Sequence, residues 1–326
     1  MDIKIHQFSP SDETAWDKFV HLSSNGTLFH LRSFLSYHID RKFDDNSLIF
    51  EKRGNIIAVF PAAKITEDKK NILYSHPGAS FGGFVYNHLS YEEADMIIKI
   101  IKDYCIKNSF HRIFFIPTPI LYSNKINNIL EYLLHWHKYH VQEYYISSMI
   151  DIRIGKSSLE YLHKRKKRYI QKYLDNDELI IKYDNNFQAF YSILLENKKK
   201  HNVSPTHSLE ELINLDKKLP GRLYLLLLYY RDEIIGGTLN IIANNKCGLV
   251  FYNMINYEFK DLQPATIQIF ESINWAKKQN LQFLDLGVSQ QPKAKNPLTP
   301  HTSLINFKEQ FGAVAIIRKA FQNIFI

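Results

Sequence analysis

The sequence predicts an α/β (α+β) protein of two similar units, each built on a mixed, mostly antiparallel sheet flanked by helices. Three observations support this prediction. The chain has 326 residues, which is the length of about two domains. Segments with the alternation of strands and segments with apolar residues at helical spacing follow one another in the same order in each half. In each half a helical segment leads into a further strand, as in a crossover to a parallel neighbour.

The composition is that of a globular protein, because 45% of the residues are hydrophobic and 23% are charged. Collagen-like, disordered and disulfide-stapled classes are therefore excluded. The two cysteines, Cys105 and Cys247, lie far apart in apolar stretches, so a cytoplasmic location is expected. The longest apolar run, from Leu223 to Tyr230, is shorter than the roughly 20 residues of a transmembrane helix, and no transmembrane segment is expected.

The charge is basic, with 41 Lys and Arg against 33 Asp and Glu, which gives +8. Such an excess favours polyanionic partners such as nucleotides, RNA or anionic lipid surfaces. A solvated, lysine-rich surface explains the same excess without any partner.

In the first half, the residues from Ser47 to Ile65 predict two strands joined by a turn at residues 52–55. A glycine-bearing strand is expected from Gly82 to Tyr86. Apolar residues at helical spacing predict a helix from Tyr91 to Ile106. A strand from Arg112 to Pro117 completes the order strand, strand, strand, helix, strand.

The second half repeats this order. Three strands are expected at Leu223 to Tyr230, Ile234 to Ile242 and Gly248 to Ile255. A helix follows from about Pro264 to Lys278, with a proline at its first position. A buried strand from Leu281 to Ser289 then matches the last strand of the first half.

A basic helix is expected between the halves, from Ser157 to about Leu174, because Ser157 and Glu160 have capping-box spacing. A strand-like stretch precedes it. The predicted domains are therefore residues 1–150 and residues 151–326.

Several short motifs carry a family resemblance. They are Phe307 to Gly312 (FKEQFG), Phe283 to Gly287 (FLDLG), Lys167 to Lys172 (KRYIQK), Gly26 to His38 and Ser75 to Gly83. With the order of segments, they resemble the acyl-CoA N-acyltransferase (GNAT) fold. Its duplication in one chain resembles the Fem family of aminoacyl transferases and its acetyltransferase-like (FemAB-type) relatives. The resemblance covers almost the whole chain.

This resemblance implies an N-acyltransferase of two tandem GNAT-like domains. The second domain would bind the donor and catalyse the reaction, and the first would be degenerate or serve the acceptor. The donor would be acetyl-CoA or another acyl-CoA. The acceptor would be an amino sugar, nucleotide- or lipid-linked, of an envelope polysaccharide precursor.

Two alternatives remain open. One is Fem-like transfer of an amino acid from aminoacyl-tRNA to a peptidoglycan precursor, because Asp261 to Thr266 lacks the glycines of the usual pyrophosphate loop. The other is a non-enzymatic nucleic-acid-binding protein that uses Lys164 to Lys172 as its contact helix.

Three residues are candidates for catalysis. By the family pattern, Lys308 would neutralise a donor phosphate or the oxyanion, unless it is an exposed helix lysine paired with a neighbour. Asp285, between two leucines in an apolar strand, would act as a base or anchor the acceptor, unless it only ends the strand. Tyr252 would protonate the leaving group, although aromatic residues near strand ends are common.

The donor-binding candidates lie in three segments. By the resemblance, the backbone at Asn253 and Met254 would polarise the acyl carbonyl. A helix start supplies free N–H groups to an anion, so Gln263, Ala265 and Thr266 are the expected phosphate site. Arg168 and Lys172 share a helix face and would bind a polyphosphate or a tRNA end, or simply face solvent.

The acceptor-binding candidates are His76, in a loop of small residues, together with His38 and Tyr257. The sequence has no H-E-x-x-H, paired C-x-x-C, Walker A, G-x-G-x-x-G or G-x-S-x-G motif. Neither a metal nor a covalent intermediate is therefore expected, and the oligomeric state is not predicted.

Overall fold

The computed structural model describes residues 2–39, 41–155, 157–200, 202–291 and 294–325. The chain divides into two compact units. Unit 1 contains Met1–Tyr144 and Ile317–Ile326, and unit 2 contains Tyr145–Ile316. The last strand of the chain thus belongs to unit 1, whereas the sequence analysis assigned it to the second domain.

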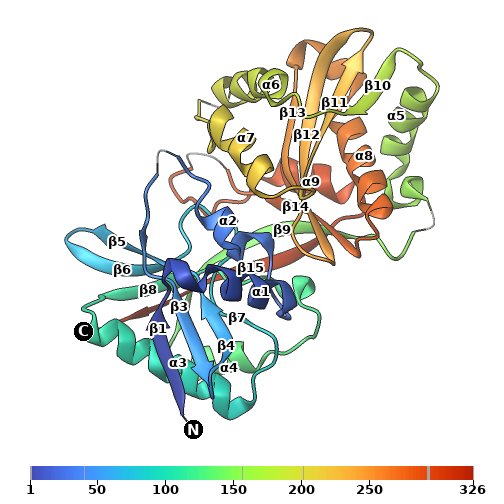
Figure 1. Cartoon of the computed structure of the whole chain (residues 1–326). Helices are drawn as coiled ribbons and strands as arrows, with labels where there is room; N and C mark the ends of the chain where they lie inside the picture. Colours follow the sequence, from blue (N-terminus) through green and yellow to red (C-terminus); the bar gives the residue numbers. More distant parts are fainter. Residues whose placement is uncertain (1, 40, 156, 201, 292–293, 326) are drawn as a thin grey trace. The chain divides into compact units, whose positions relative to one another are not determined.

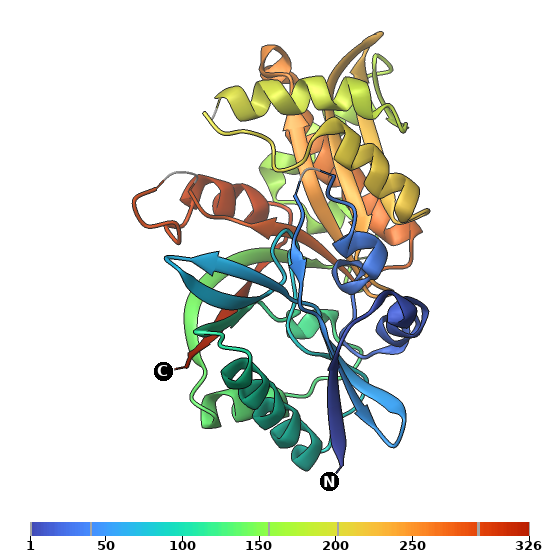
Figure 2. The ribbon, with the colours of Figure 1, turned by 60° about the vertical axis from the view of Figure 1, so that its left-hand side comes forward.

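Unit 1 contains two groups of paired strands. The first has the order β1-β3-β4-β7, from β1 (Ile3–Gln7), β3 (Leu48–Lys52), β4 (Asn55–Phe60) and β7 (Val85–Tyr86). The second has the order β15-β8-β6-β5-β2, from β15 (Val314–Ile324), β8 (Arg112–Phe115), β6 (Lys70–Ser75), β5 (Ala63–Glu67) and β2 (Asp44–Asp45). Its helices are α1 (Glu13–Leu22), α2 (Arg32–Leu35), α3 (Tyr91–Lys107) and α4 (Ile129–Trp136), with α3 packed against α4 and β1 (Figure 2).

The predicted hairpin of unit 1 is present but shorter than expected. Arg53 and Gly54 have φ of 52° and 75°, as a tight two-residue turn between β3 and β4 requires. The second strand ends at Phe60 because Pro61 has no N–H for the ladder. Residues 63–65 instead begin β5 in the other group of strands, and the strand expected at residues 82–86 shrinks to β7.

Helix α3 confirms the predicted helix. Ser90 accepts from the Glu93 N–H, while the Glu93 carboxylate accepts from the Ser90 N–H. The predicted apolar positions are all buried: Ala94, Ile97, Ile98, Ile101 and Cys105.

Unit 2 has one sheet in the order β10-β11-β12-β13-β14-β9 (Figure 1). Its strands are β9 (His140–Asp151), β10 (Leu179–Tyr183), β11 (Leu223–Tyr230), β12 (Glu233–Ile242), β13 (Cys247–Ile255) and β14 (Phe283–Val288). Its helices are α5 (Lys164–Leu174), α6 (Phe187–Lys200), α7 (Leu209–Lys218), α8 (Pro264–Lys278) and α9 (Thr302–Glu309). Helix α6 packs on β12 and β13, and α8 packs on the same strands and on α5 (Figure 1).

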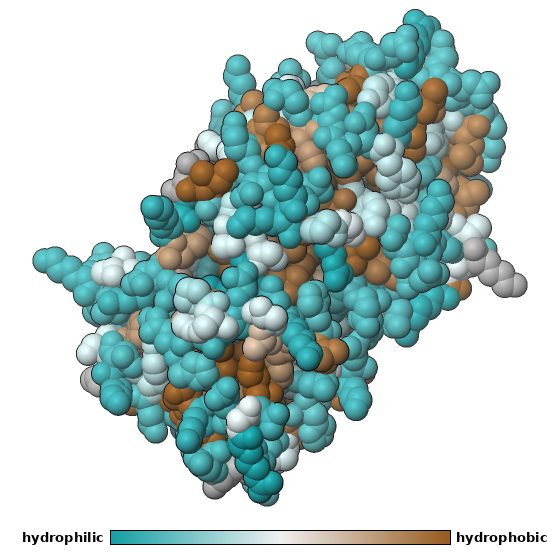
Figure 3. Space-filling view, viewed as in Figure 1, coloured by the Kyte–Doolittle hydropathy of each residue, from teal (hydrophilic) through white to brown (hydrophobic). Residues whose placement is uncertain are grey.

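The elements predicted for the second half, β11 to β14 and α8, are confirmed. The basic helix begins later than predicted, because the capping box of Ser157 and Glu160 caps a separate 3-10 turn at Ser158–Tyr161. On the side shown in Figure 3, hydrophilic residues cover most of the surface and apolar ones form small patches.

Each unit contains the same motif. In unit 1, α3 connects the parallel strands β6 and β8, and in unit 2, α8 connects the parallel strands β13 and β14. The next strand in each sheet comes from the other half of the chain: β15 pairs with β8, and β9 pairs with β14. Each sheet is therefore completed by a strand distant in sequence.

Candidate functional site

The strands β13 and β14 separate along their length. They are parallel and pair at Cys247–Leu249 and Phe283–Asp285. Among the described residues, no further pairs join them, although β13 continues to Ile255. From Val250 to Met254, β13 therefore has an open edge on the side of β14.

A β-bulge lies at the beginning of this open edge. Tyr252 pairs with Leu239 and Val250 pairs with Asn240, so Phe251 is the extra residue. The Ile255 N–H donates to Asn197 Oδ1 at 3.3 Å, so its main chain faces away from β12. Main-chain groups alternate between the two edges of a strand, and the Asn253 N–H consequently points to the open edge.

The end of β13 is tied to the start of α8. The Met254 carbonyl accepts from Gln268 Nε2 at 3.1 Å, and Asn253 Nδ2 lies 3.5 Å from the Ala265 carbonyl. Within the described residues, Asn253 Oδ1 and Gln268 Oε1 are buried without a hydrogen-bond donor. Such oxygens cost free energy until a bound molecule or water supplies a donor.

Helix α8 starts abruptly at the residues predicted to bind phosphate. Gln263 has a left-handed conformation with φ of 61°, and Pro264 opens the helix. The N–H groups of Thr266 and Ile267 both donate to the Gln263 carbonyl. Among the residues that the structure describes, no side chain caps the helix start, which leaves its positive dipole end for an anion.

Lys166 reaches the same helix start and was missed by the sequence analysis. Its Nζ donates to Thr266 Oγ1 at 2.9 Å and lies 4.5 Å from the centre of the Phe307 ring. The residue is only 6% exposed, and burial lowers the pKa of its amine to about 8. The signal was available: Lys166 lies at a four-residue interval from the buried Leu162 and Ile170.

Tyr252 lies on the opposite face of β13, toward α6 and α7. Its hydroxyl is 2.6 Å from Nδ1 of His207, a residue that the sequence analysis did not select. Tyr252 is 7% exposed and His207 is 5% exposed. No local pattern indicated His207, because this contact joins residues 45 positions apart.

Asp285 is buried, and its carboxylate accepts hydrogen bonds from other groups of the protein. Its Oδ1 accepts from Ser147 Oγ and from the Gly287 N–H, both at 2.7 Å. Gly287 has φ of 77°, and the pairing of β14 with β9 shifts register between Asp285 and Val288. These bonds favour the structural alternative for Asp285, which stabilises the irregular end of β14.

Lys308 is likewise engaged with the end of β14. Its Nζ donates to the Gly287 carbonyl at 2.8 Å, the Val288 carbonyl at 3.0 Å and Ser289 Oγ at 2.8 Å. The residue is 5% exposed, so it is not the exposed helix lysine of the alternative interpretation. These three acceptors are neutral, and they hold the ammonium at a fixed position.

Arg168 and Lys172 both lie on the exposed side of α5. They do not meet the start of α8, which Lys166 reaches from the other side of the helix. Tyr257 lies after β13, where Lys200 Nζ is 3.3 Å from the centre of its ring. Burial raises the pKa of the Tyr257 phenol.

The two predicted acceptor histidines meet in unit 1. The rings of His38 and His76 both pack against Phe43, at 5.5 and 5.3 Å between ring centres. His76 Nδ1 lies 2.7 Å from the Pro77 carbonyl, and His38 Nδ1 lies 2.8 Å from the Arg41 guanidinium. Burial lowers the pKa of His76 to about 4, so this ring is neutral near pH 7.

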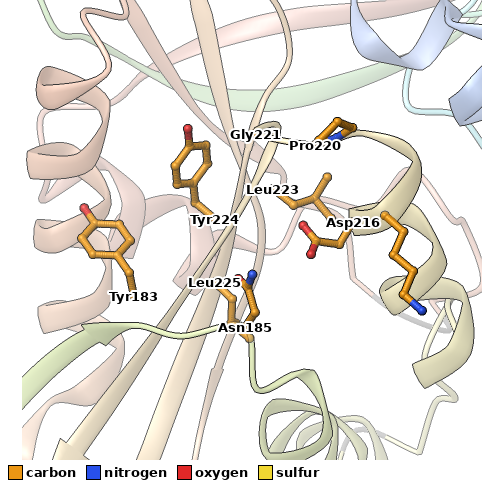
Figure 4. A pocket seen from close by; sticks show the side chains of 9 residues that line it. Tyr183, Asn185, Asp216, Pro220, Gly221, Leu223, Tyr224 and Leu225 are labelled. Atoms are coloured by element: carbon orange, nitrogen blue, oxygen red, sulfur yellow. The ribbon is translucent and has the colours of Figure 1, made fainter.

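A cavity of ≈ 400 Å³ lies at the start of β11, away from these residues. Figure 4 shows Tyr183 and Tyr224 on one side of it and Asp216 on the other. None of the predicted site residues lines it.

Two absences concern the part of the chain that the structure describes. It contains no cluster of three or more His, Cys, Asp or Glu side chains able to hold a metal ion. No helix in that part has the length and apolar character needed to cross a bilayer.

A family model matches part of unit 2. Residues 162–294 match the model of the acetyltransferase (GNAT) domain. This segment contains α5 to α8, β10 to β14, the bulge and the helix start. No curated protein matches the sequence.

Solved structures share the fold over the full length of the chain. FemX has a TM-score of 0.74 at 13% identity, covering 99% of this chain and 97% of its own. A tandem GNAT protein from the clavulanic acid biosynthesis pathway has 0.58 at 7%, covering 99% and 98%. The C-terminal domain of a putative lysylphosphatidylglycerol synthetase from Agrobacterium fabrum has 0.58 at 9%, covering 96% and 92%. The predicted fold class, with two tandem GNAT-like domains, is confirmed.

Proposed function

We propose that this chain, which carries a GNAT acetyltransferase domain, is an N-acyltransferase that moves an acyl group, in our proposal acetyl, from coenzyme A to an amine. The acceptor we propose is an amino sugar of an envelope glycan precursor. It is linked to a nucleotide or a lipid.

The observation that carries this proposal is the open edge of β13 beside the start of α8. A thioester lying along this edge would present its carbonyl to the Asn253 N–H, a fixed donor for the developing oxyanion. Asn253 Oδ1 and Gln268 Oε1 would accept from the amide groups of the pantetheine arm.

The phosphates of the donor would bind where α8 begins. The uncapped helix start and the ammonium of Lys166 are both positive, and a diphosphate would interact favourably with both. Arg168 and Lys172, exposed on α5, would contribute longer-range attraction.

Three residues have proposed roles in the reaction. Lys308, held beside the end of β14, would stabilise negative charge on the reacting group. Asp285 would fix the turn at Gly287 that positions Lys308. Tyr252 would take up the proton of the amine, a different step from the protonation of the leaving group that the sequence analysis expects.

The proposed acceptor contacts include two histidines of unit 1. In unit 1, His38 and His76 pack around Phe43, and His76 would accept a hydrogen bond from a sugar hydroxyl. Tyr257 is a third acceptor contact in this proposal.

A second candidate donor is aminoacyl-tRNA. The exposed cations of α5 favour it, and so does the fold shared with FemX. The GNAT domain weighs against the non-enzymatic alternative, in which α5 only binds nucleic acid.

The test is calorimetric titration of the full chain with acetyl-CoA and coenzyme A at low and raised salt, followed by an assay of coenzyme A release with amino-sugar acceptors. We expect one-site binding that persists in salt, because buried contacts are screened little. Lys166→Met should weaken binding about tenfold through loss of a charge-assisted contact. Lys167→Met removes an exposed charge from the same helix and should change affinity little.

Absence of acetyl-CoA binding, together with saturable binding of aminoacyl-tRNA, would replace the first candidate by the second. If binding disappears at raised salt, and if Lys166→Met and Lys167→Met weaken it equally, the start of α8 binds neither acetyl-CoA nor aminoacyl-tRNA.

A further inference from the structure

A pair of buried proton carriers lies beside the bulge of β13. Tyr252 immediately follows the bulged residue Phe251, and its Oη is 2.6 Å from His207 Nδ1. His207 precedes α7 and belongs to the loop between α6 and α7. The ring of Phe251 also contacts His207, at 5.2 Å between ring centres. The bulge therefore places this pair beside the beginning of the open edge.

The direction of the hydrogen bond follows from the acidity of the two groups. A phenol has an ordinary pKa near 10 and an imidazolium near 6.5, so in the neutral pair Tyr252 donates and His207 accepts. Nδ1 is then the unprotonated nitrogen, and the ring hydrogen is on Nε2. The phenolic oxygen has lone pairs with which it can accept while it donates.

We propose that Tyr252 and His207 form a proton relay that deprotonates the acceptor amine during acyl transfer, an inference that rests on the proposed function. As the amine nitrogen forms its bond to the acyl carbon, its N–H proton passes to Tyr252 Oη, and the phenolic proton passes to His207 Nδ1. The bond from the acyl carbon to sulfur breaks, and the thiolate takes a proton from water. The imidazolium returns its proton to solvent, which completes the balance.

The charged and titratable groups around the pair come from two helices among the described residues. On α6, Lys198 Nζ lies 5.8 Å from the centre of the Tyr252 ring, and the Tyr191 hydroxyl donates to the His207 carbonyl at 3.3 Å. Burial raises the pKa of the Tyr191 phenol, and the nearby carboxylates of Glu210 and Glu211 on α7 raise it further.

Burial lowers the pKa of the Lys198 amine. On β12, the neutral hydroxyl of Thr238 donates to the Tyr252 carbonyl at 2.8 Å and fixes the strand.

Three variants separate the relay from a structural role. His207→Asn keeps an acceptor oxygen near the position of Nδ1 but has no group that can take up the proton. Tyr252→Phe removes the first carrier. Tyr191→Phe, which loses only the bond to the His207 carbonyl, is the matched control.

The measurement is the pH profile of kcat and kcat/KM with a fixed amino-sugar acceptor and acetyl-CoA. We expect His207→Asn and Tyr252→Phe to lower kcat about 100-fold near pH 7 with little change in KM. The loss should shrink at high pH, because hydroxide can then take up the N–H proton of the attacking amine in place of the relay. Tyr191→Phe should keep the wild-type profile.

Wild-type pH profiles in both relay variants would overturn the inference while leaving the proposed function intact. A wild-type chain without transfer from any acyl-CoA would instead defeat the proposed function. If no acyl transfer is found, nitrogen-15 NMR of the histidines tests the hydrogen bond of the relay. Nδ1 of His207 must be unprotonated near pH 7, and its signal must shift in Tyr252→Phe. A proton on Nδ1 overturns the relay.

Discussion

At the scale of single residues, two buried lysines have hydrogen-bond acceptors that local sequence does not indicate. Lys166 belongs to a strongly basic helix, yet it is only 6% exposed. Lys308 was expected to meet the donor, yet its ammonium donates to three groups of its own chain. The sequence identifies the charge of a lysine but not its acceptors, because these come from elements distant in sequence.

Lys308→Ala should therefore destabilise the protein as well as impair transfer. The change leaves two carbonyls and a hydroxyl near the end of β14 without their donor, which costs about 3 kcal/mol in the free energy of unfolding. Urea denaturation measures this cost, with Lys278→Ala on the exposed side of α8 as the control. Unchanged stability together with lost turnover would give Lys308 a purely catalytic role.

The two most buried histidines of unit 1 predict a pH dependence of stability. Burial lowers the pKa of both His30 and His76 to about 4, against 6.5 for the unfolded chain. Between pH 6.5 and 4 the unfolded chain binds more protons, so stability falls as the pH falls, by about 1.4 kcal/mol per pH unit for each histidine.

Thermal unfolding at a series of pH values tests this slope. His76→Gln should lower the slope by about 1.4 kcal/mol per pH unit, whereas His140→Gln, at an exposed position, should leave the slope unchanged. If His76→Gln has the same slope as the wild type, the lowered pKa of His76 does not contribute to the pH dependence of stability.

At the scale of elements, helices and strands were predicted correctly where apolar residues recur at a regular spacing through one continuous segment. Helix α3, strands β11 to β13 and helix α8 follow directly from such patterns. Helix α6 was not predicted, although Phe187, Phe190 and Leu194 are buried at helical spacing. Strand β15 was missed because its exposed Val314 and Ile317 break the alternation.

The candidate site was predictable to a similar extent. The strand that carries Tyr252, Asn253 and Met254 and the helix start at Pro264 follow from local sequence. The bulge at Phe251 and the contact with His207 do not, since both depend on how β13 meets β12 and the loop before α7.

The end of α9 gives a prediction for an element boundary. Gly312 has φ of 73°, and a Cβ added there would lie 2.9 Å from the Tyr161 carbonyl oxygen. Gly221 has nearly the same φ of 72°, with nothing within 4 Å of an added Cβ. Gly221→Ala should cost about 1 kcal/mol from backbone strain alone, and Gly312→Ala should cost clearly more. If urea denaturation gives the same loss in the free energy of unfolding for both variants, the contact with the Tyr161 carbonyl does not add to the cost of Gly312→Ala.

At the scale of the whole molecule, each sheet depends on a strand from the other half of the chain. Ending the chain after Ile316 removes the residues of β15 that pair with β8, together with Phe321 and Phe325 of the unit 1 core. Amide hydrogen exchange should then accelerate in β8 and α3, while β11 to β13 keep their protection. Uniform loss of protection in both units would contradict this division.

Because the ribosome makes the chain from its N-terminus, the strand that completes each sheet is made at a different time from its neighbours. Arg112 and Gln322 lie in paired strands but are 210 positions apart. At 5–20 residues per second, β8 waits about 10 to 40 s for its neighbour. Unit 2 receives β9 before the rest of its sheet is made, so the unit that begins the chain is the last to be completed. Until then the exposed edge of β8 is a place where a nascent chain can pair wrongly or recruit a chaperone.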